Sequence, residues 1–80
     1  MQNIYQIRAY RWYEGKYELT EPYIVAGLSK DDARDALAAH LGGGWKASGA
    51  AELCAGSRIP LEERIRIFEK LGFPVLRAAE

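Results

Sequence analysis

The stretch from Arg8 to Leu19, RAYRWYEGKYEL, constrains the fold of this chain more than any other. Residues 4–13 and residues 17–26 are both rich in aromatic and β-branched residues, which are enriched in strands. The tripeptide Glu-Gly-Lys at 14–16 separates the two runs, and its glycine supplies the positive φ that tight turns need. The sequence therefore predicts an antiparallel β-hairpin with its turn at Gly15.

Two registers of this hairpin are open, and they differ in which side chains share a face. A two-residue turn puts Glu14 at positive φ, which is unfavourable, whereas a three-residue turn with a bulge needs only Gly15 there. We therefore expect the three-residue turn. The two-residue turn stays open as the alternative. It sets Arg11 opposite Glu18 and Arg8 opposite Glu21, which is electrostatically attractive but mixes charge into both faces.

The expected register divides the hairpin into two faces. It predicts a core face that carries Tyr5, Ile7, Ala9, Tyr17 and Leu19. On the other face it pairs Trp12 with Lys16, Tyr10 with Glu18 and Arg8 with Thr20. Tyr, Trp and Arg dominate the energetics of protein interfaces. We therefore predict that this second face binds a protein partner through Arg8, Tyr10, Trp12 and Lys16.

The residues after the hairpin predict a strand and then a helix. Pro22 interrupts the pairing because it has no N–H to donate, and residues 23–26 resume as extended chain. Ser29 is a strong helix N-cap, and Asp32 follows three residues later as in a capping box. The three glycines at 42–44 end the helix.

Two aspartates of this helix extend the candidate binding surface. Asp31 and Asp35 lie one helical turn apart, so their side chains project from the same side of the helix. Taken singly, each suits the positive end of the helix dipole or a solvated face. We include both as candidate partner-binding residues beside the hairpin.

The second half of the chain predicts a further helix and a short final strand. Residues 45–48 fit a short strand, and residues 49–55 fit a short helix, which we expect between the two main helices. Pro60 suits the first turn of the second main helix, which ends at Gly72 in a Schellman motif. Residues 73–77 follow as an edge strand, because Pro74 disfavours a central position.

These elements predict an α+β fold in one compact domain over residues 1–80. An antiparallel hairpin or small sheet packs against two main helices, with the short helix between them and the short edge strand at the C-terminus. The length of 80 residues, 49% of them hydrophobic, is enough for one modest core. A chain of this size favours surface binding over a deep catalytic cleft, so we expect no enzyme activity.

The net charge and the scarcity of metal-ligating residues exclude further classes of function. The chain carries 11 basic and 11 acidic residues, so no overall field attracts nucleic acid or an anionic membrane. His40 and Cys54 are the one histidine and the one cysteine, whereas a structural zinc site takes about four ligands. We therefore expect neither metal nor cofactor, and we expect Cys54 to be a small buried apolar residue.

The location of the protein follows from similar arguments. A single cysteine forms no internal disulfide, and the first residues lack the pattern of a signal peptide. No run approaches the roughly 18–20 apolar residues that span a bilayer. We expect a cytoplasmic protein that does not enter membranes.

The order of elements resembles that of a known class of small proteins. An aromatic hairpin is followed by residues 23–33, YIVAGLSKDDA, which run from a strand into a capped helix. In size and element order this first half resembles small proteins of phages and mobile elements, of which the anti-CRISPR proteins are the best known. The resemblance implies a protein of the host cytoplasm that occupies a surface of a CRISPR surveillance complex and denies it DNA.

The sequence is compatible with three functions. The leading hypothesis is a small non-catalytic inhibitor that binds a protein partner stoichiometrically. The second is an accessory domain that binds nucleic acid, in which bases stack on the aromatic side chains and cations meet phosphates. The third is a homo-oligomerisation domain in which the hairpin meets its own copy.

Overall fold

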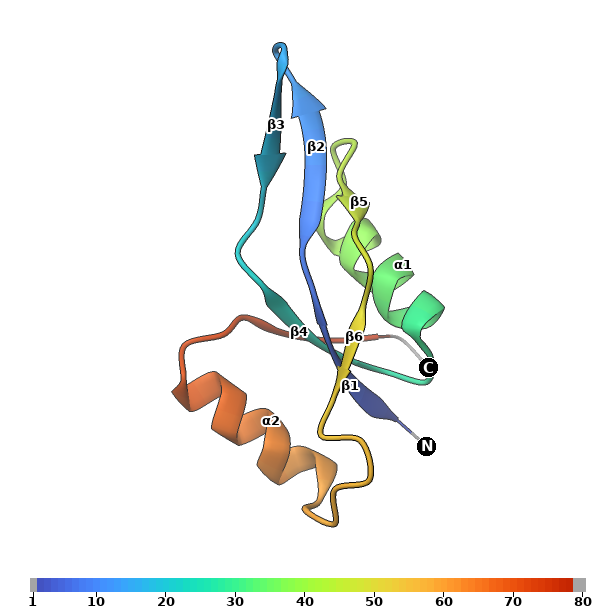
Figure 1. Cartoon of the computed structure of the whole chain (residues 1–80), viewed down its shortest axis with the longest axis vertical. Helices are drawn as coiled ribbons and strands as arrows, with labels where there is room; N and C mark the ends of the chain where they lie inside the picture. The colour runs from blue at the N-terminus through green and yellow to red at the C-terminus, as the bar shows by residue number, and fades with distance from the viewer. Residues whose placement is uncertain (1, 79–80) are drawn as a thin grey trace.

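The computed structural model describes residues 2–78, which form an elongated molecule measuring 45 × 25 × 17 Å (Figure 1). In chain order the elements are β1 (Asn3–Ile7), β2 (Ala9–Tyr13), β3 (Lys16–Leu19), β4 (Tyr23–Gly27), α1 (Lys30–Leu41), β5 (Lys46–Ala47), β6 (Ala51–Leu53), α2 (Leu61–Lys70) and β7 (Val75–Arg77). The strands form two sheets, one of four strands and one of three. This confirms the predicted α+β class with two main helices.

The four-stranded sheet is the centre of the molecule. Its strand order is β6-β1-β4-β7, in which β1 runs antiparallel to both β6 and β4, while β7 runs parallel to β4. The predicted C-terminal edge strand is thus confirmed as β7. Side chains alternate between the two faces of a strand, and here each face packs against a different helix.

Two small cores lie on opposite faces of this sheet. On one face the buried cluster joins β1, β2 and β4 to α1 and comprises Tyr5, Ile7, Ala9, Val25, Ala33 and Leu37. On the other face the buried cluster joins β1 and β4 to α2 and comprises Ile4, Ile24, Ala26 and Ile65. Strands buried on both faces read as nearly continuous apolar runs, which explains the sequence YIVAG of β4.

Local signals set the ends of both helices where the sequence predicts them. The Asp32 N–H donates to Ser29 Oγ at 3.1 Å, which caps α1. At the end of α2 the Phe73 N–H donates to the Phe68 carbonyl at 3.1 Å, and Gly72 takes a φ of 92°. These are the features of a Schellman ending. The Phe68 and Phe73 rings also meet edge to face, with centroids 5.9 Å apart.

The three-stranded sheet carries the hairpin away from the centre. Its order is β3-β2-β5, and β5 pairs only with Ala9 and Tyr10 at the base of β2. The chain passes from the first sheet into the second at Arg8, between β1 and β2. It returns through residues 20–22, where Pro22 interrupts pairing as expected. Figure 1 shows the β2–β3 tip extending beyond the rest of the molecule.

The predicted three-residue turn is wrong, and the alternative register is the one observed. Tyr13 pairs with Lys16 across a two-residue turn, in which Glu14 has a φ of 49° and Gly15 a φ of 80°. Such a turn matches the right-handed twist of the two strands. Arg11 lies opposite Glu18, and their side chains form a 2.7 Å ion pair. Cross-strand pairing thus outweighs the unfavourable backbone of Glu14.

The change of register also corrects part of the predicted core face. Tyr5, Ile7 and Ala9 are buried as predicted. Tyr17 and Leu19, by contrast, are 70% and 64% exposed. A shift of one residue exchanges the two faces of a strand, so Tyr17 lies opposite Trp12 and Leu19 opposite Tyr10.

The short helix predicted over residues 49–55 is also wrong. Lys46–Ala47 forms the short strand β5, as residues 45–48 suggest, but Ala51–Leu53 is the strand β6. β6 pairs with residues 4–6 of β1 and places Leu53 against the α2 core. It thereby satisfies backbone groups of β1 that are buried on this side. Tertiary pairing overrides the weak helix propensity of this segment.

Shortening a core side chain tests the two-sided packing of the central sheet. We expect Ile24→Ala to lower the free energy of unfolding by about 2–5 kcal/mol, because Ile24 is fully buried against α2. Urea denaturation followed by circular dichroism measures the loss. As a control, Ile67→Ala on the outer side of α2 removes a side chain that is 49% exposed, and we expect a change within about 0.5 kcal/mol. Equal effects of the two substitutions would contradict this packing.

The backbone of Glu14 gives a second test of the fold. Asn tolerates the left-handed region better than Glu, so Glu14→Asn should stabilise the protein by about 0.5 kcal/mol. Thermal and urea denaturation measure the change. Glu21→Asn is the control, since that residue lies outside the turn. A destabilised Glu14→Asn variant would argue against the two-residue turn.

Candidate functional site

The hairpin presents an exposed apolar surface, here called the aromatic face and formed by Tyr10, Trp12, Tyr17 and Leu19. The Trp12 and Tyr17 rings meet edge to face with centroids 4.8 Å apart, and the Tyr10 and Tyr17 rings are 6.4 Å apart. Trp12 is 63% exposed, and Tyr17 and Leu19 are exposed to a similar extent. Tyr10 and Trp12 are two residues apart on β2 and so share a face, as do Tyr17 and Leu19 on β3. Trp12 lies opposite Tyr17 and Tyr10 opposite Leu19, which brings all four side chains together.

A stack of charged and aromatic groups stiffens the opposite side of the hairpin. The Arg11 guanidinium lies 4.6 Å from the ring centroids of both Tyr13 and Trp45. The same guanidinium group donates through Nε to Glu18 Oε1 at 2.7 Å. This Arg11 stack joins β2 to β3 and to the segment that leads into β5. A planar guanidinium suits such stacking better than an ammonium group.

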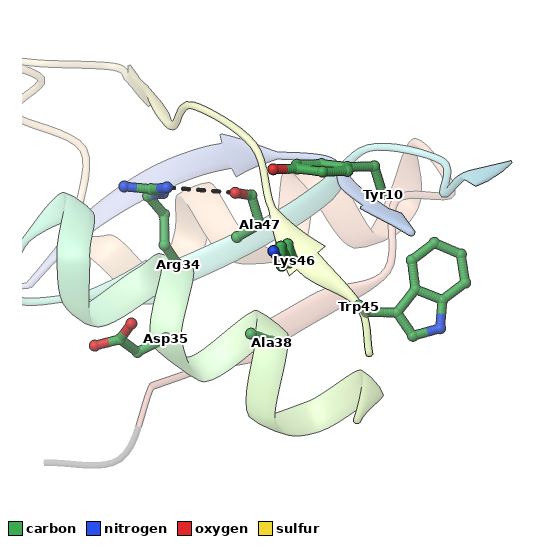
Figure 2. A pocket seen from close by; sticks show the side chains of 7 residues that line it. All are labelled: Tyr10, Arg34, Asp35, Ala38, Trp45, Lys46 and Ala47. Carbon is green, nitrogen blue, oxygen red and sulfur yellow. Dashed lines mark hydrogen bonds between the residues drawn. The ribbon is translucent and has the colours of Figure 1, made fainter. Parts of the chain in front are cut away.

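A side pocket of about 320 Å³ opens between α1 and β5. It is lined by Tyr10, Arg34, Asp35, Ala38, Trp45, Lys46 and Ala47, as Figure 2 shows. Arg34 is engaged in holding α1 to the following chain, because its Nε donates to the Ser48 carbonyl at 3.0 Å. Because Tyr10 belongs both to the lining of the pocket and to the aromatic face, the two sites adjoin.

The structure brings together some of the predicted partner-binding residues and separates others. Tyr10 and Trp12 lie on the aromatic face, and Tyr10 and Asp35 share the side pocket. Lys16 pairs with Tyr13 and so lies on the opposite face of the hairpin. Arg8 is exposed at the junction of β1 and β2, outside the hairpin, and Asp31 is exposed beside Arg34.

The observed register is the reason that Tyr17 and Leu19 lie on the aromatic face although the sequence-based site omits them. The three-residue turn predicts Tyr17 and Leu19 in the core, and the sequence places Trp45 in a short strand. The signal for the first two was present in the sequence as the opposite charges of Arg11 and Glu18. No local pattern identifies Trp45, since its contact with Arg11 depends on the tertiary fold.

Other chemical features of the described chain are modest. Among residues 2–78, no three side chains of His, Cys, Asp or Glu lie close enough to hold a metal ion together. Cys54 is exposed at a φ of 59°, so the expectation of a buried Cys54 is wrong. In the same range, neither helix is long and apolar enough to cross a membrane.

The strongest ion pair outside the hairpin ties α2 to β7. The two terminal nitrogens of the Arg77 guanidinium, Nη1 and Nη2, donate to the two carboxylate oxygens of Glu62, each at 2.7 Å. Hydrogen bonding from Arg77 holds the pKa of Glu62 below its usual value. A lowered folded-state pKa gives a stabilisation that is present above the unfolded-state pKa and is lost as the pH falls through the folded one. Because the Glu62 side chain is 57% exposed, screening by solvent keeps this effect small.

Comparisons with protein-family models, with curated proteins and with solved structures find no match to this chain. Function is therefore inferred from the side chains of the aromatic face and of the elements that support it.

Replacing Arg11 tests whether the stack supports the hairpin. We expect Arg11→Ala to lower the free energy of unfolding by about 1–2 kcal/mol, through the loss of two ring contacts and one ion pair. Arg11→Lys keeps the charge but loses the planar stacking, so it should recover less than half of the loss. Urea denaturation measures both variants. Full recovery by lysine would show that charge alone matters, against the stacking account.

Proposed function

We propose that this chain is a non-catalytic binding protein that engages a protein partner stoichiometrically through the aromatic face. The observation that carries the proposal is a row of exposed Trp, Tyr and Leu side chains on a hairpin that extends beyond the body. Contiguous exposed apolar patches mark interaction sites. Trp and Tyr are also the residues most often found as binding hot spots.

The support behind the aromatic face strengthens this proposal. A rigid surface loses less conformational entropy on binding than a flexible one. The Arg11 stack and the β5 pairing hold β2 from the other side, so Trp12 is presented on a supported strand. Asp35 and Lys46 in the adjoining side pocket add charges at the rim, where interfaces are polar.

A protein partner suits this surface better than nucleic acid. A single-stranded nucleic-acid platform sets cations beside its stacking rings. Here Lys16 lies on the other face of the hairpin, and the net charge of the chain is zero. Lys46 lies opposite Tyr10 and adds one cation beside the rings, which is little charge to hold a row of phosphates.

The resemblance to anti-CRISPR proteins makes a CRISPR surveillance complex the first partner to test. In this form of the proposal the chain acts in the host cytoplasm. It occupies a protein surface of the complex and blocks binding of target DNA, with no catalytic step.

A binding assay against purified surveillance complexes tests the proposal. We expect Trp12→Ala/Tyr17→Ala to weaken binding by about 30-fold or more, as the loss of a hot spot does. The matched control is Ile67→Ala/Leu71→Ala, which removes exposed apolar side chains from α2 and from its C-cap and should bind normally. Circular dichroism confirms that each variant is folded.

A pull-down from a CRISPR-bearing host and a phage restriction assay in the same host can exclude the surveillance complex as the partner. It is excluded if the pull-down recovers no subunit of the complex and phage restriction is unaffected. Salt-sensitive binding of oligonucleotides at about 50 mM salt would instead favour the nucleic-acid function. Equal loss in both double variants would remove the aromatic face as the binding surface.

A further inference from the structure

The outer edge of β3 is open. Over residues 2–78, β3 is the last strand of its sheet and pairs with β2 alone, and Figure 1 shows no element along its other side. In a hairpin with a two-residue turn, the residues flanking the turn exchange hydrogen bonds, and the pairs then alternate. The backbone groups of Lys16 and Glu18 therefore point to β2, while those of Tyr17 and Leu19 point outward.

Natural proteins protect such edges because an unpaired row of N–H and C=O groups is a template for another strand. The short length of β3 and its charged residues Lys16 and Glu18 give part of this protection. The prolines of the chain lie outside β3, however, and the outward-pointing backbone groups of Tyr17 and Leu19 can still donate and accept. The charges of Lys16 and Glu18, on either side of Tyr17, decide which strand can pair with this edge.

The charge pattern of β3 is complementary to itself. When two copies pair antiparallel about Tyr17, Lys16 of each copy lies opposite Glu18 of the other, which gives two attractive pairs. The neighbouring register is centred on Glu18 and sets two carboxylates directly opposite each other, which is repulsive. Both registers join outward backbone groups, since centring on Glu18 would pair Tyr17 with Leu19 of the other copy. The charges therefore decide in favour of the register centred on Tyr17.

We propose that this chain forms a symmetric dimer by pairing β3 with β3 of a second copy, antiparallel and centred on Tyr17. The two three-stranded sheets then become one continuous sheet. A two-fold axis perpendicular to that sheet keeps both aromatic faces on the same side. Trp12 and Tyr17 of one copy continue into Tyr17 and Trp12 of the other, which doubles the width of the surface.

The dimer leaves the aromatic face open and does not depend on the proposed partner. It also places no residue of the side pocket at the new junction, because β5 lies at the opposite edge of the sheet. Pairing of one short strand joins few residues, so the association is weak and depends on concentration. A chain that binds the surveillance complex yet stays monomeric contradicts this inference alone.

Sedimentation velocity of the whole chain, from low micromolar to near-millimolar concentration, is the first measurement. We expect a reversible monomer–dimer equilibrium. Lys16→Glu turns both attractive pairs into repulsive ones while leaving the Arg11–Glu18 ion pair in place, so it should weaken dimerisation by about tenfold or more. Lys30→Glu on α1 makes the same change of net charge away from β3 and should dimerise normally.

Charge exchange between two variants tests the register. Glu18→Lys should also fail to dimerise by itself, but a 1:1 mixture with Lys16→Glu restores both attractive pairs and should form a heterodimer. A wild-type chain that is monomeric throughout overturns the proposal. So does a dimer that Lys16→Glu leaves intact, or one that Trp12→Ala abolishes, since that pattern indicates face-to-face contact. If Glu18→Lys unfolds the hairpin, the Lys16→Glu result decides.

Discussion

The pairing of Arg11 with Glu18 is the interaction on which the functional surface depends. It fixes the two-residue turn, and the turn fixes which side chains lie opposite one another along β2 and β3. The Arg11 guanidinium also stacks between Tyr13 and Trp45, so the same side chain attaches the hairpin to the segment before β5. The energy of these contacts offsets the strained backbone of Glu14.

The rest of the hairpin follows from that constraint. With Arg11, Glu18 and Tyr13 on one face, the alternation of a strand places Trp12 and Tyr17 on the other. The central sheet uses both of its own faces to bury α1 and α2, so its core does not extend over the hairpin. The aromatic face consequently stays exposed, and the outer edge of β3 stays open to a second copy.

Local chemistry predicted most of the fold and only part of the candidate site. The cap at Ser29 and the Schellman ending at Gly72 are signals within a few residues, and both helices begin and end accordingly. β6 depends on pairing with β1, which no local signal reveals. The hairpin register required weighing the cost at Glu14 against contacts that include Trp45, far along the chain, and a one-residue error exchanged the faces of β3.

The most direct test of the account is the register of the hairpin in solution. In an antiparallel ladder, two opposite residues that form a non-hydrogen-bonded pair bring their Cα atoms to about 4.5 Å. We therefore predict strong Hα–Hα nuclear Overhauser effects between Trp12 and Tyr17 and between Tyr10 and Leu19. Contacts between Tyr10 and Glu18 or between Trp12 and Lys16 would contradict the account, because they would return Tyr17 to the core face.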